Sequence, residues 1–304
     1  MHDPIVNLQL LINGLAIGSI YALVALGFVL IYNAVGVVNF AQGDFVMLPS
    51  YVAISFLVPT ITVFGLSLHW QLPAIGVYLL VLALMIGFAL LFTKIAYAPL
   101  RDRGWMPVVI STIGVSIFLR NFAQITWGSQ PLSFPSPFPV ETLDFAGLHV
   151  RPQDLLIIAV TAVLIAFQYF LFEKTPLGKQ MQATAQDRTT ARLLGIRVGR
   201  IVSITFIYSV LLGTISGLLV SPIFSVTKEM GSLIALKAFA ASIVGGFGNI
   251  PGAIMGGLAI GVVETFGGFY ISSSYTDAIA FVILIGVLLL RPQGIFGERV
   301  AEKA

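Results

Sequence analysis

The stretch EKTPLGKQMQATAQDRTTARLLGIRVGR, residues 173–200, is a charged segment in a chain of 304 residues that is otherwise rich in apolar side chains. It holds six of the protein's 16 Lys and Arg residues and lies between two apolar runs, residues 155–172 and 201–220. Each run approaches the ~20 residues with which a helix crosses a bilayer. Because Lys and Arg concentrate in cytoplasmic loops, the pattern predicts a cytoplasmic loop between two membrane spans.

Signals for local folding are present within this loop. Thr175 followed by Pro176 is typical of a helix start, with Thr as the cap and Pro at the first helical position. Asp187 can cap a second helix over residues 188–194, which Gly195 would end in a left-handed conformation. We therefore expect two short helices at the membrane surface that dock a partner. The alternative is a solvated basic loop that only sets the orientation of the chain.

The composition of the whole chain indicates a membrane protein. It is 58% hydrophobic and only 10% charged, whereas soluble proteins carry ~25% charged residues. The long apolar runs favour an all-α, polytopic transmembrane helical bundle, because a β-barrel would show short alternating segments. The formal net charge is only +3 and no basic face is evident, so no nucleic-acid partner is expected.

The chain carries none of the common enzyme motifs. It has no cysteine, which excludes disulfides, thiol nucleophiles and Cys metal sites. Its three histidines are scattered at positions 2, 69 and 149, so we expect no metal site. It also lacks the G-x-x-x-x-G-K-[ST] loop that cradles nucleotide phosphates. We expect a subunit that is no enzyme, binds no cofactor directly and relies on another chain for any ATP hydrolysis.

Apolar runs divide the chain into eight clear spans within a single transmembrane domain, residues 1–304. A further apolar segment, residues 234–247, is about half as long as a span and ends in glycine, so it either crosses or re-enters the membrane. The pair Gly14-x-x-x-Gly18 predicts close helix contact in the first span. Arg120 lies near the far end of the fourth span, where it can extend toward the interface. The eight spans are residues 8–32, 45–63, 72–97, 108–124, 155–172, 201–220, 253–270 and 278–290.

The Lys and Arg residues also predict the orientation. Residues 1–93 contain none, and twelve of the 16 fall in three segments that share the inside if the N-terminus is outside. The C-terminus is then inside, which requires an odd number of crossings. The proline-rich segment 126–152 is predicted to be a periplasmic loop, with a small hairpin over residues 141–150 around Ala146 and Gly147. The three basic segments are residues 94–103, 174–200 and 291–303.

Two glycine-interrupted polar segments, one in each half of the chain, point to a transport path. GVVNFAQGDFVMLPS, residues 36–50, places polar groups inside apolar sequence, and GGFGNIP, residues 245–251, ends the short apolar segment. Charged groups at membrane depth are costly and usually face a cavity or protein interior. We expect the two segments to approach each other; the alternative is that Asp44 sits in a short aqueous turn between spans. The candidate path residues are Asn39, Gln42, Gly43, Asp44, Gly245, Gly246, Gly248, Asn249 and Glu264.

Three segments closely resemble the permeases of bacterial branched-chain amino-acid ABC transporters, and the resemblance runs through nearly the whole chain. They are GLAIGSIYALVALGFVLIYNAVGVVNFAQGDF (14–45), AQDRTTARLLGI (185–196) and KAFAASIVGGFGNIPGAIMGG (237–257). The chain looks like the shorter of that family's two permease subunits. It departs from many relatives at Gln186, where the family often has an acidic residue.

The resemblance implies a five-part importer in the bacterial inner membrane. A second, different permease completes the path, two ATPase subunits bind ATP and Mg on the cytoplasmic side, and a periplasmic binding protein delivers the substrate. Residues 173–200 would be the coupling loop that rests on an ATPase subunit. The implied coupling residues are Asp187, Arg188, Ala191, Arg192, Leu194 and Gly195.

We therefore expect a permease subunit of an ATP-driven importer of amino acids, branched-chain ones first. The same architecture also serves urea, short amides and other amino acids. An ion-coupled secondary carrier is a competing interpretation, but it would hold several ionisable groups within the membrane, and the main candidates here are Asp44 and Glu264. A channel would instead need a repeated filter in a homo-oligomer.

Overall fold

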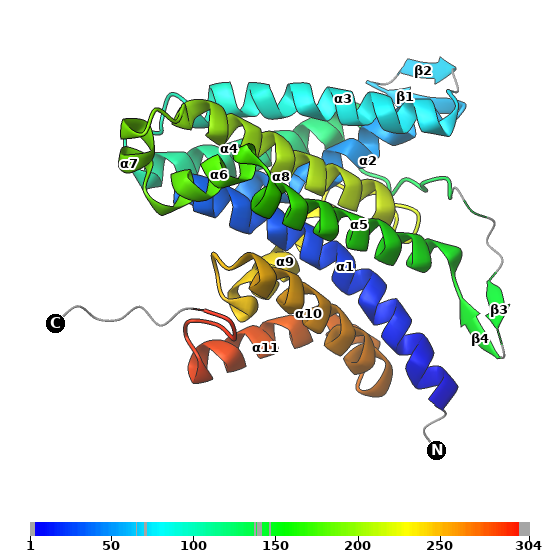
Figure 1. Cartoon of the computed structure of the whole chain (residues 1–304). Coiled ribbons are helices and arrows are strands. Elements are labelled where there is room, and N and C mark those ends of the chain that lie inside the picture. The colour runs from blue at the N-terminus through cyan, green and yellow to red at the C-terminus, as the bar shows by residue number, and fades with distance from the viewer. Residues whose placement is uncertain are drawn as a thin grey trace. The chain divides into compact units, whose positions relative to one another are not determined.

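The computed structural model describes residues 4–64, 66–69, 72–136, 138, 142–145 and 147–297. Eleven α-helices make up most of this part of the chain, and four short strands form two hairpins (Figure 1). The helices are α1 Pro4–Val35, α2 Asp44–Leu57, α3 Ala74–Phe92, α4 Trp105–Trp127, α5 Pro152–Lys174, α6 Pro176–Gln186, α7 Arg188–Leu193, α8 Val198–Val220, α9 Met230–Gly245, α10 Ile250–Tyr270 and α11 Thr276–Leu290. The strands are β1 Thr60–Val63, β2 Leu66–His69, β3 Leu143–Phe145 and β4 Leu148–Val150. Short 3-10 turns cover Phe40–Gln42 and Ser273–Tyr275, and a π-helical turn, Thr93–Tyr97, extends α3.

Eight helical segments in the described residues are long and apolar enough to cross a membrane. They match the eight predicted spans, so the all-α polytopic fold is confirmed. The additional half-length segment is α9, which has 16 residues and begins at Met230, four residues before the predicted start. At 1.5 Å per residue α9 is about 24 Å long, less than the ~30 Å hydrocarbon core.

The second span is shorter than its apolar run predicts. The run predicts a helix to residue 63, but α2 ends at Leu57, and β1 follows and pairs antiparallel with β2. Pro59 explains the difference, because a proline disfavours the helical conformation in the residue before it, and Val58 is extended with ψ 130°. The β-branched residues of the sequence TITV in β1 then favour a strand.

The predicted outer hairpin is present. β3 and β4 pair antiparallel, with Leu143 opposite Val150. Gly147, in the predicted turn, has φ +87°, a backbone conformation that glycine adopts without strain. Two other positions named for this hairpin, Glu141 and Ala146, lie outside the described residues.

The contacts divide the chain into two compact units, each assembled from segments that are distant in sequence. Unit 1 combines Met1–Val29, Val140–Ala162 and Ile234–Ala304, and unit 2 combines Leu30–Pro139 and Val163–Leu233. Most of α1 and α9 therefore belongs to unit 1, together with α10 and α11. Unit 2 holds α2, α3, α4, α6, α7 and α8 complete.

In unit 1, α1 and α10 pack at backbone distance along a stripe of glycines. A Cβ added to Gly14 would lie 2.8 Å from the Cα of Val262, and one added to Gly18 would lie 2.9 Å from the Cα of Leu258. On α10, Gly257 lies against the backbone of α1 in the same way. Small residues permit this approach between membrane helices, so the close contact predicted from Gly14-x-x-x-Gly18 is confirmed.

In unit 2, α2 is the central helix and packs against α8 and α3. Gly213 of α8 lies against Phe45, and Gly217 lies against the backbone carbonyl of Val46, so the two helices meet closely. Phe45 also makes an edge-to-face contact with Phe92 of α3, with ring centroids 5.3 Å apart. This packing holds the beginning of α2 in the interior of the unit.

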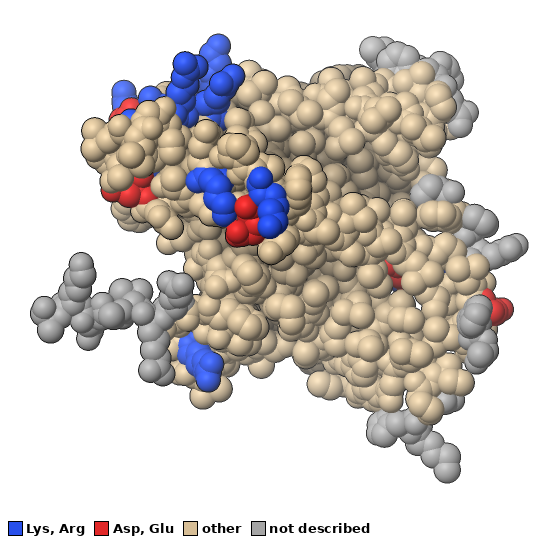
Figure 2. Space-filling model, viewed as in Figure 1, with Lys and Arg blue, Asp and Glu red and all other residues tan. Residues whose placement is uncertain are grey.

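Charged side chains gather at the end of unit 2 where α6 and α7 lie (Figure 2). The sides of the helices in Figure 2 show few charged residues. This end includes Arg101 and Arg103 in the α3–α4 connection, together with the Lys and Arg residues of the segment 173–200. Such a concentration of cations is typical of the cytoplasmic side of a membrane protein.

A cysteine placed at position 185 should be labelled only from the inside of the cell. Ala185 is exposed at the end of α6, and the native chain has no cysteine to give background. A membrane-impermeant maleimide should leave this variant unlabelled in intact cells and label it after permeabilisation. A cysteine at exposed position 142, in the predicted outer loop, serves as the control. It should react both in intact cells and in permeabilised cells. Labelling at position 185 in intact cells would reverse the orientation.

Candidate functional site

The chain breaks between α1 and α2, and the break is built from its own polar residues. α1 ends before Gly36, whose φ of +70° favours glycine. The side chain of Asn39 then caps the 3-10 turn Phe40–Gln42 by accepting a hydrogen bond from the Ala41 N–H at 3.1 Å. The N–H of Phe40 donates to Thr112 Oγ1 at 3.2 Å. Since Thr112 is the eighth of the 23 residues of α4, the break lies beside the interior of a spanning helix rather than beyond its end.

The polar side chains of the break are buried and incompletely paired. Asn39, Gln42 and Asp44 expose 2%, 0% and 3% of their surfaces. Gln42 Oε1 accepts a hydrogen bond from Ser209 Oγ at 3.0 Å. Among the described residues, Asn39 Nδ2, Gln42 Nε2 and Asp44 Oδ2 have no hydrogen-bond partner. A buried polar group without a partner costs ~1–3 kcal/mol, so three such atoms within six residues call for an explanation.

An arginine from α4 faces this break. Arg120 Nε lies 3.7 Å from Asp44 Oδ1, its Nη1 lies 3.7 Å from Glu229 Oε2, and its Nη2 donates to Ser116 Oγ at 2.7 Å. The extension of Arg120 toward the membrane interface stays a prediction; its side chain is turned to the carboxylates of its own unit. The reason is electrostatic, because an opposite charge in a low-dielectric interior attracts it more strongly than in water.

Aromatic and polar groups surround the ion cluster of Asp44, Arg120 and Glu229. Lys228 Nζ donates to Gln124 Oε1 at 2.6 Å, next to Glu229 in the segment that precedes α9. Trp127 stacks on Tyr51 at a centroid distance of 5.0 Å. The cluster thus carries both signs of charge, and it lies entirely within unit 2.

The second predicted polar segment forms the turn between α9 and α10 in unit 1. Gly246 and Gly248 have φ of +110° and +97°, and Asn249 caps α10 by accepting a hydrogen bond from the Gly252 N–H at 2.8 Å. The Phe296 N–H donates to the carbonyl of Gly245 at 3.0 Å. This turn packs against the segment 294–297. The backbone conformation and the close packing therefore explain why glycine occupies these positions. A transport role for them stays a prediction, as does their approach to residues 39–44.

Glu264, the remaining candidate path residue, belongs to an ion cluster that the sequence did not reveal. Lys237 Nζ lies 2.5 Å from Glu264 Oε1 and 2.7 Å from Asp277 Oδ1. The same ammonium group lies 5.7 Å from the centre of the Tyr21 ring. Glu264 and Lys237 expose 5% and 8% of their surfaces, so their charges are balanced inside unit 1.

The charged segment 173–200 folds into two short capped helices, as predicted, whereas its coupling role stays a prediction. Thr175 caps α6 by accepting a hydrogen bond from the Gly178 N–H at 3.1 Å. Asp187 caps α7, with Oδ1 accepting from the Thr189 N–H at 2.8 Å and Oδ2 from Thr190 Oγ1 at 2.5 Å. The Thr190 hydroxyl and then the backbone N–H groups stabilise the carboxylate and lower the pKa of Asp187 below its usual range. Gly195 follows with φ +82°.

The two faces of α7 differ in chemistry. Arg188 and Arg192, four residues apart, share one face, as their spacing predicts, and both line a cavity of this same chain. Ala191 is buried at 1% exposure. Leu193 and Leu194, in contrast, are 84% and 74% exposed. Leu193 and Leu194 therefore form an exposed apolar patch, beside which Arg192, Thr189 and Thr190 are exposed as well, while Arg188 and Arg192 also line the cavity.

Asp187→Ala is expected to loosen α7 without preventing membrane insertion. The amides of α7 should exchange with deuterium severalfold faster, as expected for loss of one helix cap. Because the folded-state pKa is lowered, the cap acts fully above the unfolded-state pKa and is lost as pH falls through the folded-state pKa. Asp187→Asn, which keeps a cap, should remove this pH dependence. Equal exchange in Asp187→Ala and the native chain would argue against the cap.

Taken together, these features define a class: polytopic helical membrane proteins with a polar break inside the bundle and a folded basic loop at one end, the organisation of a transport permease. The chain matches the family model for the permease component of the branched-chain amino acid transport system over residues 10–288. It belongs to this family.

Relatives agree over nearly the whole chain. The high-affinity branched-chain amino acid transport system permease protein LivH of Escherichia coli strain K12 is 34% identical, and BraD of Pseudomonas aeruginosa is 35% identical, each over 97% of both chains. The LivH of Salmonella typhimurium is 33% identical over the same share. Among solved structures, PsaBC from Streptococcus pneumoniae in complex with Fab is similar over 92% of this chain and 91% of that chain, with a TM-score of 0.51 and 15% identity. This last likeness concerns the fold alone.

Proposed function

We propose that this chain is a permease subunit of an ATP-driven, binding-protein-dependent importer of branched-chain amino acids in the bacterial inner membrane. The observation that carries the proposal is the break at residues 36–44, where buried polar atoms without hydrogen-bond partners lie beside the interior of the spanning helix α4. A helix that only anchors a protein has no use for such groups. A transport path supplies passing solute or water as their partners.

The charges near the break favour an amino acid over a neutral solute. An amino acid carries one ammonium and one carboxylate group, and the cluster offers the carboxylates of Asp44 and Glu229 beside the Arg120 guanidinium. Neutral urea needs no such pair of charges. The branched-chain class rests on the relatives, whose names specify branched-chain amino acid transport.

The proposed partners follow from the family and from the exposed surfaces. Two ATPase subunits would hold ATP and Mg, and one of them would receive the exposed Leu193 and Leu194 at the end of α7. A second, different permease would complete the path, and a periplasmic binding protein would deliver the substrate. The candidate span Ser273–Leu290 is only 6% buried within this chain, which leaves its surface for lipid or for another subunit.

Reconstitution separates this proposal from its main competitor. The chain is incorporated into liposomes with its partner permease and ATPase subunits, and labelled leucine is supplied with the binding protein. Uptake should require the binding protein outside and ATP on the ATPase side, with urea as a competitor that has no effect. Uptake by the permeases alone, driven by a proton or sodium gradient, would instead establish an ion-coupled carrier.

Deleting residues 141–150 should impair stimulation by the binding protein. The β3–β4 hairpin extends from the predicted outer loop, where a partner can reach it (Figure 1). In the reconstituted complex, ATP hydrolysis stimulated by the binding protein should fall severalfold, while basal hydrolysis should change little. An equal fall in both rates would indicate a folding defect and would remove the hairpin from the docking surface.

A further inference from the structure

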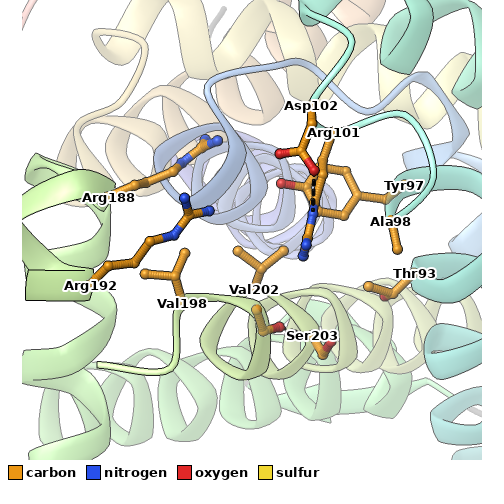
Figure 3. A pocket seen from close by; sticks show the side chains of 11 residues that line it. Thr93, Tyr97, Ala98, Arg101, Asp102, Arg188, Arg192, Val198, Val202 and Ser203 are labelled. Atoms are coloured by element: carbon orange, nitrogen blue, oxygen red, sulfur yellow. Dashed lines mark hydrogen bonds and ion pairs between the residues drawn. The ribbon is translucent and has the colours of Figure 1, made fainter. Parts of the chain in front are cut away.

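A small cavity lies at the charged end of unit 2 (Figure 3); none of residues 36–44 lines it, although Arg188 from its lining lies beside Gly36 at the start of the break. Its volume is about 80 Å³, and its lining comes from the end of α3 with the connection that follows, from α7, and from the beginning of α8. Three of the lining side chains are arginines: Arg101, Arg188 and Arg192. The proposed transport path does not use this cavity.

The cavity has a surplus of positive charge. Among the described residues that line it, Asp102 is the only acidic one, and Arg101 Nε lies 3.3 Å from Asp102 Oδ2. Arg188 and Arg192 form no ion pair with any residue that the structure describes. Figure 3 shows these two side chains reaching from α7 toward the cavity, with Arg101 and Asp102 on the other side. Like charges held close together repel, so the arrangement is suited to an anion between them.

The anion that best fits this lining is a phosphate group. The planar guanidinium donates paired hydrogen bonds to phosphate oxygens. The cavity also includes Thr93 and Val202, which belong to the ends of membrane-spanning segments. Basic pockets between helices on the cytoplasmic side receive lipid head groups, and acidic lipids give that surface its negative potential. We propose that this cavity binds the phosphate group of an acidic phospholipid of the cytoplasmic leaflet.

A carboxylate of the ATPase partner is the alternative anion that could bind between these arginines. The exposed apolar surface of α7, Leu193 and Leu194, does not line the cavity. The surface proposed to dock the ATPase and the arginine side chains therefore belong to different faces of the same short helix. This separation favours a lipid, which approaches from the membrane, over a soluble subunit.

A bound phosphate would tie three elements together. It would link α7 to the α3–α4 connection and to the beginning of α8, and so hold the coupling helix against the spans. The effect of this link on ATPase docking rests on the proposed function, whereas the binding itself does not. Binding can therefore be measured on the full-length chain without ATP, substrate or partner subunits.

The test is native mass spectrometry of the full-length chain in detergent, with phosphatidylglycerol or phosphatidylcholine added at equal concentrations. The native chain should retain one phosphatidylglycerol beyond the phosphatidylcholine background. The variant Arg101→Gln/Arg188→Gln/Arg192→Gln should bind it at least ~10-fold more weakly, because charge-assisted hydrogen bonds to phosphate are lost. The control Arg103→Gln/Arg197→Gln/Arg200→Gln removes the same charge from exposed residues that do not line the cavity, and it should bind like the native chain.

Two further arms identify the source of the phosphate. Inorganic phosphate alone is titrated into the native chain; tight, arginine-dependent binding of it without lipid binding would overturn the lipid in favour of a free anion. A triple Arg→Lys variant, which keeps the charge, should recover part of the lipid binding and shows that the site still folds. Equal phosphatidylglycerol binding by the native chain and the triple Gln variant would overturn the site. Loss of ATPase subunits from that variant, with no lipid or phosphate binding in the native chain, would assign the arginines to a partner's carboxylate.

Discussion

Arg120→Gln is expected to reduce amino-acid uptake by more than tenfold while the subunit still inserts into the membrane. The substitution leaves Asp44, whose side chain is 4% exposed, without its cation. Removing one partner of a buried ion pair costs ~3–5 kcal/mol in soluble proteins. The lower end applies here, because the Arg120 side chain is 31% exposed and lies 3.7 Å from Asp44. The measurement is ATP-dependent leucine uptake by the reconstituted complex.

Two companion variants separate a transport role from a structural one. Arg120→Lys keeps the charge and should retain part of the uptake. The double variant Asp44→Asn/Arg120→Gln removes both charges; Glu229 also loses its cation, but its side chain is 54% exposed and can be solvated, so the fold should recover. If uptake stays lost in the double variant, these charges act on the solute. Restored uptake would show that the Asp44–Arg120 pair only stabilises the fold. It would count against a role of these residues in the proposed transport path.

The second large effect is expected from Lys237→Met in unit 1. Lys237 balances Glu264 and Asp277 at 2.5 and 2.7 Å. The Glu264 side chain is only 7% exposed, so the loss of its cation should destabilise the unit by ~3–5 kcal/mol. Asp277 is 68% exposed on its side chain and can be solvated instead. We expect a clearly lowered midpoint of thermal unfolding in detergent and poor recovery of the purified chain.

Rescue and control variants test the cause of this destabilisation. Lys237→Met/Glu264→Gln removes both buried charges and should regain most of the lost stability. Lys179→Met is the matched control, because Lys179 pairs with Glu173 at 3.0 Å with both side chains about half exposed. Such surface pairs contribute ~0–1 kcal/mol, so the unfolding midpoint should hardly move. A Lys237→Met variant as stable as this control would show that the buried cluster carries no stability.

Features that depend on neighbours along the chain could be predicted from the sequence. The caps at Thr175 and Asp187 act on backbone groups two or three residues away, and the Gly14-x-x-x-Gly18 stripe needs only the helical repeat. The end of the second span differs from the prediction for a local reason. Pro59 lies within the apolar run from which the span is predicted. Apolar character alone does not distinguish a helix from a buried strand, so it does not locate the end of the helix.

The ion clusters could not be derived in the same way. Arg120 and Glu229 are 109 positions apart in the sequence, and their contact exists only because α4 packs beside the segment before α9. Lys237 and Glu264 lie on different helices, and their 27-residue separation matches no helical repeat. The sequence identified Asp44 and Glu264 as unusual charges, but the partners that balance them are a product of tertiary packing.

The glycine seam between α1 and α10 also limits how unit 1 can move. Cα atoms of one helix occupy the spaces that Gly14 and Gly18 leave on the other, so sliding the helices by one position would drive Val262 or Leu258 into the facing backbone. Close-packed interiors resist such continuous deformation. We therefore expect α1 and α10 to move as one rigid body during a transport cycle. The hinges of the movement should lie elsewhere in the chain.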